Sequence, residues 1–213
     1  PCPTRIPGDP LSLKTTVFSQ FGNPPGSLGR LVGHVMAAKG DSRTRGRWTV
    51  DLLQLAPTDR VLEVGYGPGV VTGWLCEEVP DGQVVGVDRS ATMCDQASRR
   101  NRFHIDSGLL DLRVGDAEDL PDGLGPFDAA CGMNVWQFWT DPVATLAGIG
   151  ATLRPGGRIA MTYLQPTATA TAGEDAERQL TSQLNEAGLV DVRIERLPMG
   201  AKEAICGLAR TEH

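Results

Sequence analysis

The sequence of 213 residues is poor in basic, aromatic and continuously apolar stretches, and each shortage excludes a class of protein. The formal net charge is −6, so the chain lacks the basic excess that a nucleic-acid substrate requires. No apolar run approaches the roughly 20 residues of a membrane-spanning helix. Only 5% of the residues are aromatic, so a local concentration of aromatic side chains is informative. The length suits one domain with a sizeable core.

The number and spacing of the cysteines exclude two kinds of cross-linked site. Five of them lie at positions 2, 76, 94, 131 and 206, without a Cys-x-x-Cys pair. An odd, scattered set suits neither a disulfide framework nor a zinc site, so we expect reduced thiols and no metal. Residues 1–5 lack the basic-then-apolar order of a signal peptide, and we expect a cytoplasmic location.

The most informative stretch is 61–69, Val-Leu-Glu-Val-Gly-Tyr-Gly-Pro-Gly. Its apolar start predicts a strand buried on both faces, as in a parallel sheet that helices cover. Gly65, Gly67 and Gly69 then predict a turn whose backbone N–H groups can approach a ligand closely. A helix expected at about 70–79 directs its positive N-terminal end at the same place. This pattern is typical of the nucleotide-binding corner of a doubly wound α/β fold.

A dinucleotide is not the favoured ligand of this corner. The fingerprint G-x-G-x-x-G needs its third glycine at position 70, which is Val70. Glu63 at the end of the strand adds negative charge, which disfavours a pyrophosphate and suits a cationic, zwitterionic ligand. A nicotinamide-dependent oxidoreductase is therefore the less favoured alternative.

Four further segments follow in chain order, at 84–88, 115–121, 127–131 and 153–159. With the glycine-rich turn they resemble the class I S-adenosylmethionine-dependent methyltransferases, whose first motif is E/D-x-G-x-G-x-G. The resemblance covers residues 60–164, and within the family it is similar to small-molecule enzymes of the quinone-biosynthesis type. It implies S-adenosyl-L-methionine as cofactor and S-adenosyl-L-homocysteine as product. It also implies a Rossmann-like sheet of seven strands, mostly parallel, with the last strand antiparallel.

The hydrophobic pattern divides the chain into an N-terminal arm with helices, residues 1–56, and a cofactor-binding methyltransferase domain, residues 57–213. In the first part, 1–25 predicts an arm with a turn or two of helix, and helices follow at 27–39 and about 43–55. In the second, strands are expected at 60–64, 83–88, 111–114, 127–132, 157–164, 190–196 and 203–210, with helices at 70–79, 90–101, 141–152 and 174–187. Because few residues follow the fifth of these strands before the next helix, we expect residues 1–56 to supply a lid over the substrate.

The expected cofactor contacts come from the strand ends. They are Glu63, Gly65, Tyr66, Gly67, Gly69, Asp88, Arg89, Asp116, Ala117, Met133 and Asn134. Asp88 lies 19 residues after Gly69 and can accept both ribose hydroxyls, with a helix cap as the alternative. Asp116 can accept from the adenine amino group, or shape a turn. Tyr66 is expected over the methionine portion as a cation–π partner of the sulfonium, or as packing in the turn.

Three of the eleven aromatic residues fall between 136 and 139, after the fourth strand of the second part. Trp136, Phe138 and Trp139 predict the lining of a planar acceptor at the sheet edge, with core packing as the alternative. By resemblance, Asn134 directs a backbone carbonyl or amide at the reacting methyl. His34 is the candidate general base, with an exposed polar role as the alternative.

Two arginine groups, at 43, 45 and 47 and at 99, 100 and 102, predict solvated helix surface. The alternative is contact with an anionic acceptor or with the carboxylate of the cofactor. Together these features predict in-line methyl transfer to a small organic acceptor of the aromatic or quinone-like kind. We expect a protein that binds no nucleic acid and does not span a membrane, and a homodimer is compatible with the sequence. A cofactor-binding protein without catalysis is the further alternative.

Overall fold

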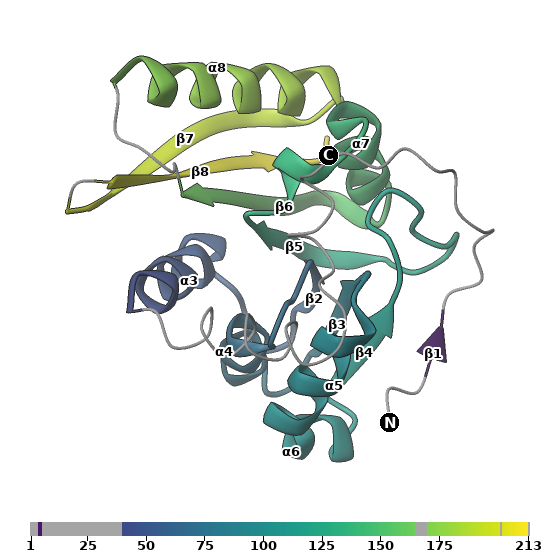
Figure 1. Ribbon diagram of the computed structural model, residues 1–213. Helices are drawn as coiled ribbons and strands as arrows, with labels where there is room; N and C mark the ends of the chain where they lie inside the picture. Colours follow the sequence, from purple (N-terminus) through teal and green to yellow (C-terminus); the bar gives the residue numbers. More distant parts are fainter. Residues whose placement is uncertain (1–3, 6–39, 165–169, 201, 213) are drawn as a thin grey trace, which may run out of the picture.

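The computed structural model of the chain describes residues 4–5, 40–164, 170–200 and 202–212 (Figure 1). The expected helix 27–39, with His34, lies outside these residues. In chain order the elements are β1 (Thr4–Arg5), α3 (Gly40–Leu53), β2 (Arg60–Val64), α4 (Val70–Glu78), β3 (Gln83–Asp88), α5 (Ala91–Arg100), α6 (Arg102–Asp106), β4 (Leu110–Val114), β5 (Phe127–Met133), the 3-10 helix η1 (Trp136–Phe138), α7 (Pro142–Ala151), β6 (Leu153–Leu164), α8 (Ala170–Glu186), β7 (Val190–Met199) and β8 (Lys202–Arg210).

The strands form one sheet in the order β1-β4-β3-β2-β5-β6-β8-β7. Neighbours from β4 to β6 pair in parallel, and β8 is antiparallel to both β6 and β7. This confirms the predicted seven-stranded mixed sheet. The two-residue β1 adds an eighth strand, parallel to β4, that is too short to leave a pattern in the sequence. From β2 the chain builds outward through β3 and β4, and then returns to the other side of β2 with β5, so the strand order reverses between β2 and β5. In open α/β sheets, ligands bind outside the carboxyl ends of the strands at such a reversal.

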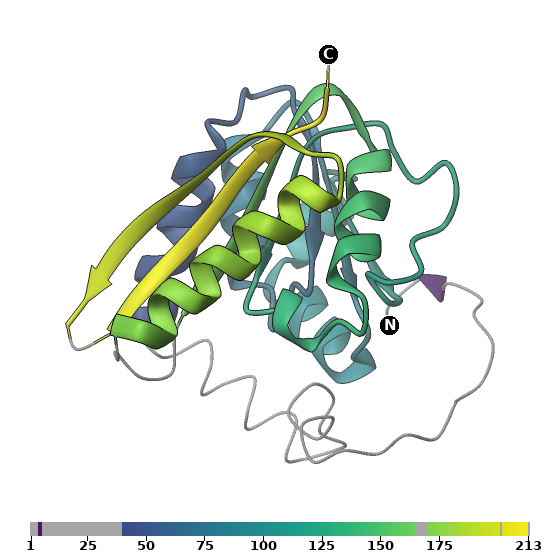
Figure 2. The same cartoon turned by 90° about the horizontal axis from the view of Figure 1, so that it is seen from above.

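Helices cover both faces of the sheet (Figure 2). One core packs α3, α4 and α5 against residues such as Val61, Val84 and Ala129. The other packs α7 and α8 against the next residues along the same strands, Leu62 and Ala130 among them. Because successive residues point to opposite faces and both faces are buried, these strands read as unbroken apolar runs in the sequence.

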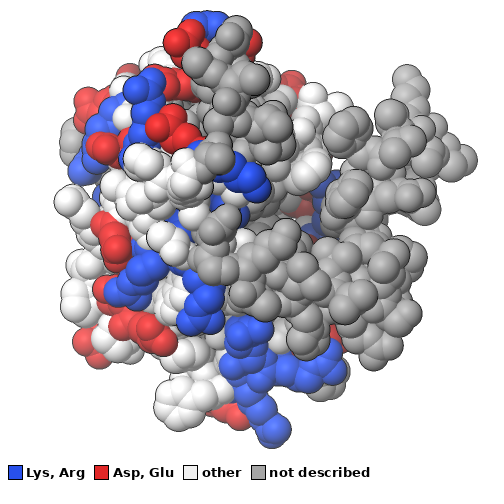
Figure 3. All heavy atoms as spheres, turned by 60° about the vertical axis from the view of Figure 1, so that its left-hand side comes forward, with Lys and Arg blue, Asp and Glu red and all other residues white. Residues whose placement is uncertain are grey.

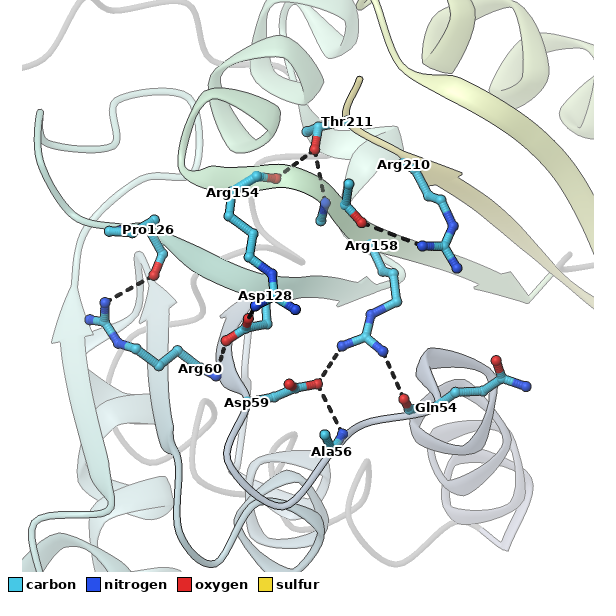
Figure 4. Close-up of polar contacts among 12 residues, drawn as sticks. Gln54, Ala56, Asp59, Arg60, Pro126, Asp128, Arg154, Arg158, Arg210 and Thr211 are labelled. Atoms are coloured by element: carbon cyan, nitrogen blue, oxygen red, sulfur yellow. Dashed lines mark hydrogen bonds and ion pairs between the residues drawn. The ribbon is translucent and has the colours of Figure 1, made fainter. Parts of the chain in front are cut away.

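A polar network ties the elements together at the amino ends of the strands (Figure 4). Arg158 of β6 pairs with Asp59 and donates from Nη1 to the Gln54 carbonyl at 2.7 Å. The backbone N–H of Arg60 donates to Asp128 Oδ2 at 2.6 Å, while Arg154 Nη1 lies 2.5 Å from Asp128 Oδ1. These bonds anchor the C-terminal end of α3, so its N-terminal turn lies toward the opposite, carboxyl edge of the sheet.

The cysteines differ from the expectation at one position. Cys94, on α5, is disulfide-bonded, which corrects the prediction that all thiols are reduced. Cys76, Cys131 and Cys206 are free and buried. Burial raises the pKa of Cys76 and Cys206 to about 12, so both remain protonated and unreactive at neutral pH.

Among the described residues, no helix is both long enough and apolar enough to span a membrane.

Candidate functional site

The glycine-rich loop connects β2 to α4 at the carboxyl edge. Gly65, Gly67 and Gly69 all have positive φ angles, of 71°, 53° and 75°. A Cβ on Gly65 would lie 2.3 Å from a methyl group of Val135, so a side chain there would clash. By contrast, a Cβ on Gly67 would meet no atom of the described residues within 4 Å. The middle of the loop is therefore the part that stays open to a ligand.

Asp88, at the end of β3, reaches across to this loop. Its Oδ2 accepts from the Gly67 N–H at 2.8 Å and its Oδ1 accepts from the Ser90 N–H at 2.9 Å. The Ser90 hydroxyl, and not Asp88, caps α5 by accepting from the Met93 N–H at 3.3 Å. Each carboxylate oxygen of Asp88 keeps further acceptor capacity, which two ribose hydroxyls could use. Burial raises the pKa of Asp88, and the two backbone N–H donors partly offset that rise.

Glu63 lies beneath the loop with a side chain that is almost fully buried, at 4% exposure of the residue. Its Oε2 accepts from the hydroxyl of Thr72, in the first turn of α4, at 2.6 Å. Burial raises the pKa of Glu63 from 4.5 to about 7, while the Thr72 hydroxyl acts in the opposite direction and Asp88 raises the pKa further. A cation bound nearby would favour the ionised form of this carboxyl.

Tyr66 both lines the pocket and packs against the sheet. Its ring is buried against Gly86, where a Cβ would lie 2.7 Å from the Tyr66 Cδ1 atom. The hydroxyl donates to the Arg113 carbonyl of β4 at 3.2 Å. The ring therefore packs toward β3 and β4, as in the packing alternative, and its contact with the methionine portion stays a prediction.

The loop after β4 carries the residues expected at the adenine. Asp116 is partly exposed, and its Oδ1 accepts from the Glu118 N–H at 3.1 Å, as in a side-chain turn. Ala117 is also partly exposed and packs against the core beside α7. Both interpretations of Asp116 thus remain open, because a carboxylate in such a turn retains acceptor sites. Arg89, next to Asp88, is exposed.

A pocket opens beside the loop, toward α3. It is lined by Ser42, Arg43, Arg45, Glu63, Gly65, Tyr66, Gly67, Pro68, Val70, Val71, Met133 and Asn134. For the α3 arginines at 43, 45 and 47, the sequence favours a solvated surface and offers contact with the cofactor carboxylate or an anionic acceptor as the alternative. Gly46 allows the close packing of α3 on α4, since a Cβ there would lie 2.8 Å from a methyl group of Val71.

Arg45 is the α3 residue that changes the chemistry of this pocket. It is buried, at 4% exposure, although it belongs to a group expected on the solvated surface. Its position three and four residues before Trp48 and Thr49 places it on the inward helix face, which is the signal that could have revealed it. On the side of the molecule that carries α3 and α4, Lys and Arg side chains follow one another from the centre to the lower edge (Figure 3). The pocket thus joins a buried carboxyl on one wall to a buried guanidinium on another.

Asn134, just after β5, has a left-handed backbone with φ 52°. Its N–H donates to the Thr162 carbonyl at 2.8 Å, and its side-chain Oδ1 accepts from the Leu164 N–H at 2.9 Å. Because the backbone N–H and the side-chain Oδ1 both bind β6, the backbone carbonyl and the side-chain Nδ2 are the groups that Asn134 can direct toward a ligand. Met133, the last residue of β5, lines the same pocket.

The three aromatic candidates occupy different environments. Trp136 and Trp139 belong to the core beside α7, with exposed fractions of 4% and 9%, whereas Phe138 is 37% exposed. The Trp136 ring meets that of Tyr163 edge-on, with centroids 5.5 Å apart. The Trp136 indole N–H is buried and finds no hydrogen-bond partner in the part of the chain that the structure describes. Core packing accounts for Trp139, but it leaves the Trp136 donor unexplained.

The described residues contain no cluster of three or more His, Cys, Asp or Glu side chains that could hold a metal ion. His34 lies outside these residues, so its assignment as a base stays a prediction.

Comparisons with known proteins agree with this geometry. The methyltransferase-domain family matches residues 61–157. An uncharacterized methyltransferase of Bacillus subtilis is 27% identical over 183 residues, which cover 84% of this chain and 97% of that protein. An uncharacterized 37.1 kDa transposon protein of Streptomyces fradiae is 31% identical over 163 residues, or 73% of this chain. The chain spans only 46% of the length of the Streptomyces protein.

Among solved structures, the chain is similar to a geranyl diphosphate methyltransferase in complex with S-adenosylmethionine. The TM-score is 0.65 at 17% identity, over 91% of this chain and 94% of the other. At this identity the likeness supports the fold.

Proposed function

The chain is a class I S-adenosylmethionine-dependent methyltransferase, and we propose that its acceptor is a small, planar organic molecule of the aromatic or quinone-like kind. The acceptor would lie at the carboxyl edge of the sheet, close to Met133 and Asn134. There the pocket meets the glycine-rich loop, and the aromatic segment η1 follows Asn134 in the chain after one residue.

In this proposal the residues at the strand ends would hold the cofactor. Asp88 would accept from the ribose hydroxyls, and Asp116 with Ala117 would hold the adenine. Glu63 would face the positive amino-acid end, and Arg45 of α3 would receive its carboxylate. The open space at Gly67 and the opposite charges of the two pocket walls support this assignment, because they fit a zwitterion.

When bound, S-adenosylmethionine supplies an electrophilic methyl group on a sulfonium. The chain then has to hold the acceptor in line with that methyl group and to exclude water. Such positioning can contribute roughly 7–11 kcal/mol to lowering a barrier. Glu63, the carboxyl that lines the pocket, is assigned to the cofactor in this proposal. The proposal therefore favours an acceptor that is already nucleophilic, with His34 as the candidate base otherwise.

The Trp136 indole N–H is the observation that carries the choice of acceptor. Buried indole N–H groups almost always have a partner, because an unsatisfied buried donor costs roughly 1–3 kcal/mol. This one has none among the described residues, and it lies beside Tyr163 at the carboxyl ends of β5 and β6. An oxygen of a bound phenol or quinone would accept from it, and the aromatic edge would pack on the acceptor ring.

Calorimetric titration and a labelled-methyl assay test the proposal. We expect the protein to bind S-adenosylmethionine and S-adenosylhomocysteine but not NAD, and to label quinols or phenols in preference to amines and fatty acids. Binding of NAD alone would favour the oxidoreductase alternative. Cofactor binding without labelling of any acceptor would favour the protein without catalysis.

A matched pair of variants tests the role of Trp136. Trp136→Phe removes the N–H and keeps a ring, so the KM for the acceptor should rise while cofactor affinity is unchanged. Trp139→Phe, in the same core, should alter neither. Equal effects of the two variants would assign Trp136 to the core alone.

The domain and assembly assignments are further parts of the proposal. Residues 1–56 would act as a substrate cap and 57–213 as the cofactor-binding domain, with α3 as the wall that both share. Light scattering would identify a homodimer. The acidic net charge supports a small-molecule partner over nucleic acid.

A further inference from the structure

The C-terminal end of α5 holds the last two residues of the glycine-rich loop. Asn101 is buried, at 4% exposure, and its Nδ2 donates to the Gly69 carbonyl at 2.8 Å across 32 residues of sequence. Arg100 Nε donates to the Pro68 carbonyl at 2.9 Å. Two successive carbonyls of the loop are thus fixed by two successive residues of another element.

The bond from Asn101 to Gly69, together with the first helical bond that this N-cap carbonyl accepts, fixes where the next N–H group points. In a trans peptide the C=O and N–H bonds are directed to opposite sides. Because the Gly69 carbonyl points toward α5, the N–H of Val70 points away from α5, and Val70 lines the pocket. Val70 is the first residue of α4, so the helix itself cannot satisfy this N–H. The side chain of Asn101 thereby aims a backbone donor at the site.

The packing around Asn101 prevents its side chain from turning away. A Cβ on Gly69 would lie 2.6 Å from Asn101 Nδ2, and a Cβ on Gly73 would lie 2.9 Å from Asn101 Oδ1. The amide therefore fits between the loop and the first turn of α4 because both positions are glycine. Asn101 Nδ2 also donates to the Ala97 carbonyl at 3.1 Å, in the last turn of α5. That bond finishes α5, whereas the bond to Gly69 couples α5 to the loop.

We propose that Asn101, assisted by Arg100, is a positioning residue of the cofactor site: it fixes the Gly69–Val70 peptide so that the Val70 N–H faces the cofactor. The inference rests on the proposed assignment of the loop to S-adenosylmethionine. It adds a residue from outside the loop, and from outside the pocket lining, to the determinants of cofactor affinity.

The variant Asn101→Asp tests this role because it keeps the shape of the side chain and replaces its donor with an acceptor. A carboxylate oxygen facing the Gly69 carbonyl would repel it and turn the peptide. We expect dissociation constants for S-adenosylmethionine and S-adenosylhomocysteine, measured by calorimetry well below the melting temperature, to rise about tenfold. Both should rise equally, since the peptide is displaced for either ligand. A change for the cationic cofactor alone would indicate an effect of the new charge and would overturn the proposal.

Asn185→Asp is the matched control. Asn185 Nδ2 also donates to a carbonyl four residues earlier, that of Thr181, at 2.8 Å, but on the exposed face of α8. This variant should leave both dissociation constants unchanged. If Asn101→Asp lowers only the melting temperature and binds both ligands like the wild type, Asn101 is a helix-ending residue and the positioning role is wrong.

Arg100→Ala provides a second test on a residue that is exposed and tolerant of change, should Asn101→Asp fail to fold. We expect a severalfold loss of affinity relative to Arg99→Ala, the variant of its exposed neighbour. Equal affinities in these two variants would contradict the inference. A wild-type protein that binds neither ligand would instead overturn the assignment of the loop, and with it the proposed cofactor site.

Discussion

Replacing Glu63 with glutamine should separate stability from cofactor binding in a pH-dependent way. The Glu63→Gln variant keeps the size of the side chain, and its amide oxygen can still accept from the Thr72 hydroxyl. What the substitution removes is a buried group that titrates near neutral pH.

The expected size of the effect on stability follows from the pKa of Glu63, which burial raises from 4.5 to about 7. The native protein binds this proton more tightly than the unfolded chain does. The contribution of Glu63 to stability is therefore complete below pH 4.5 and is lost as the pH rises through 7. At about 1.4 kcal/mol per pH unit, the loss amounts to about 3 kcal/mol. Without cofactor, Glu63→Gln should thus match the wild type at pH 4 and exceed its free energy of unfolding by about that amount at pH 8.

Cofactor affinity should change in the opposite sense. A sulfonium or ammonium group near Glu63 favours the ionised carboxyl, so wild-type affinity should increase between pH 6 and pH 8. The affinity of Glu63→Gln should be weaker at pH 8 and nearly independent of pH. A more stable variant that binds less well is the usual cost of removing a destabilising functional group.

Urea denaturation at pH 4 and pH 8, with calorimetric titration at pH 6 and pH 8, measures both effects. Glu186→Gln is the control, because Glu186 also accepts from a side-chain hydroxyl at 2.6 Å, that of Ser182, but on the protein surface. If the free energies of unfolding of wild type and Glu63→Gln keep a constant difference from pH 4 to pH 8, the argument from burial is refuted.

Three further variants address the loop, the ribose contact and the polar network. Asp88→Ala should weaken cofactor binding more than tenfold with an unchanged circular dichroism spectrum, and an unaltered dissociation constant would remove the ribose assignment. Gly65→Ala should lower the free energy of unfolding by about 1–3 kcal/mol, because the new Cβ would lie 2.3 Å from a methyl group of Val135 and the φ angle at position 65 is 71°. Adding Val135→Ala to this variant should restore part of the lost stability, and no restoration would mean that the clash is not the cause. Asp59→Ala should lower the free energy of unfolding by about 3 kcal/mol in denaturant titrations, because it leaves the partly buried Arg158 guanidinium without its carboxylate. Cofactor affinity should stay constant, and a loss of affinity would contradict the separation of the two ends of the sheet.

Much of the fold follows from local sequence patterns. The strand at 83–88 and the helices α4, α5 and α7 lie within a residue or two of their predicted bounds, because buried parallel strands and amphipathic helices differ in period. Helix α8 begins at Ala170, four residues before its predicted start. The strand that begins at Leu153 extends through a Pro-Gly-Gly segment that reads as a turn, because its pairing with Phe127 lies outside the local pattern.

The site was predictable where spacing along the chain determines position, as for Asp88 at the end of β3. The position of a side chain was not predictable where its partner lies far away in the sequence. The orientation of Tyr66 depends on space beside Gly86, and the role of Asn101 depends on a carbonyl 32 residues earlier. The charge of Arg45 favours a solvated position, but its place on the inward face of α3 buries it, and the alternative of contact with the cofactor carboxylate stays a prediction.

The network of Arg158, Asp59, Arg154 and Asp128 lies at the end of the sheet remote from the pocket. Evolution can therefore diversify the loops at one end of the strands without breaking the ion pairs and hydrogen bonds at the other. A library that randomises the exposed positions Gln137, Phe138 and Thr140 while retaining this network should yield mostly folded proteins, and it offers a practical starting point for redirecting the enzyme to new acceptors.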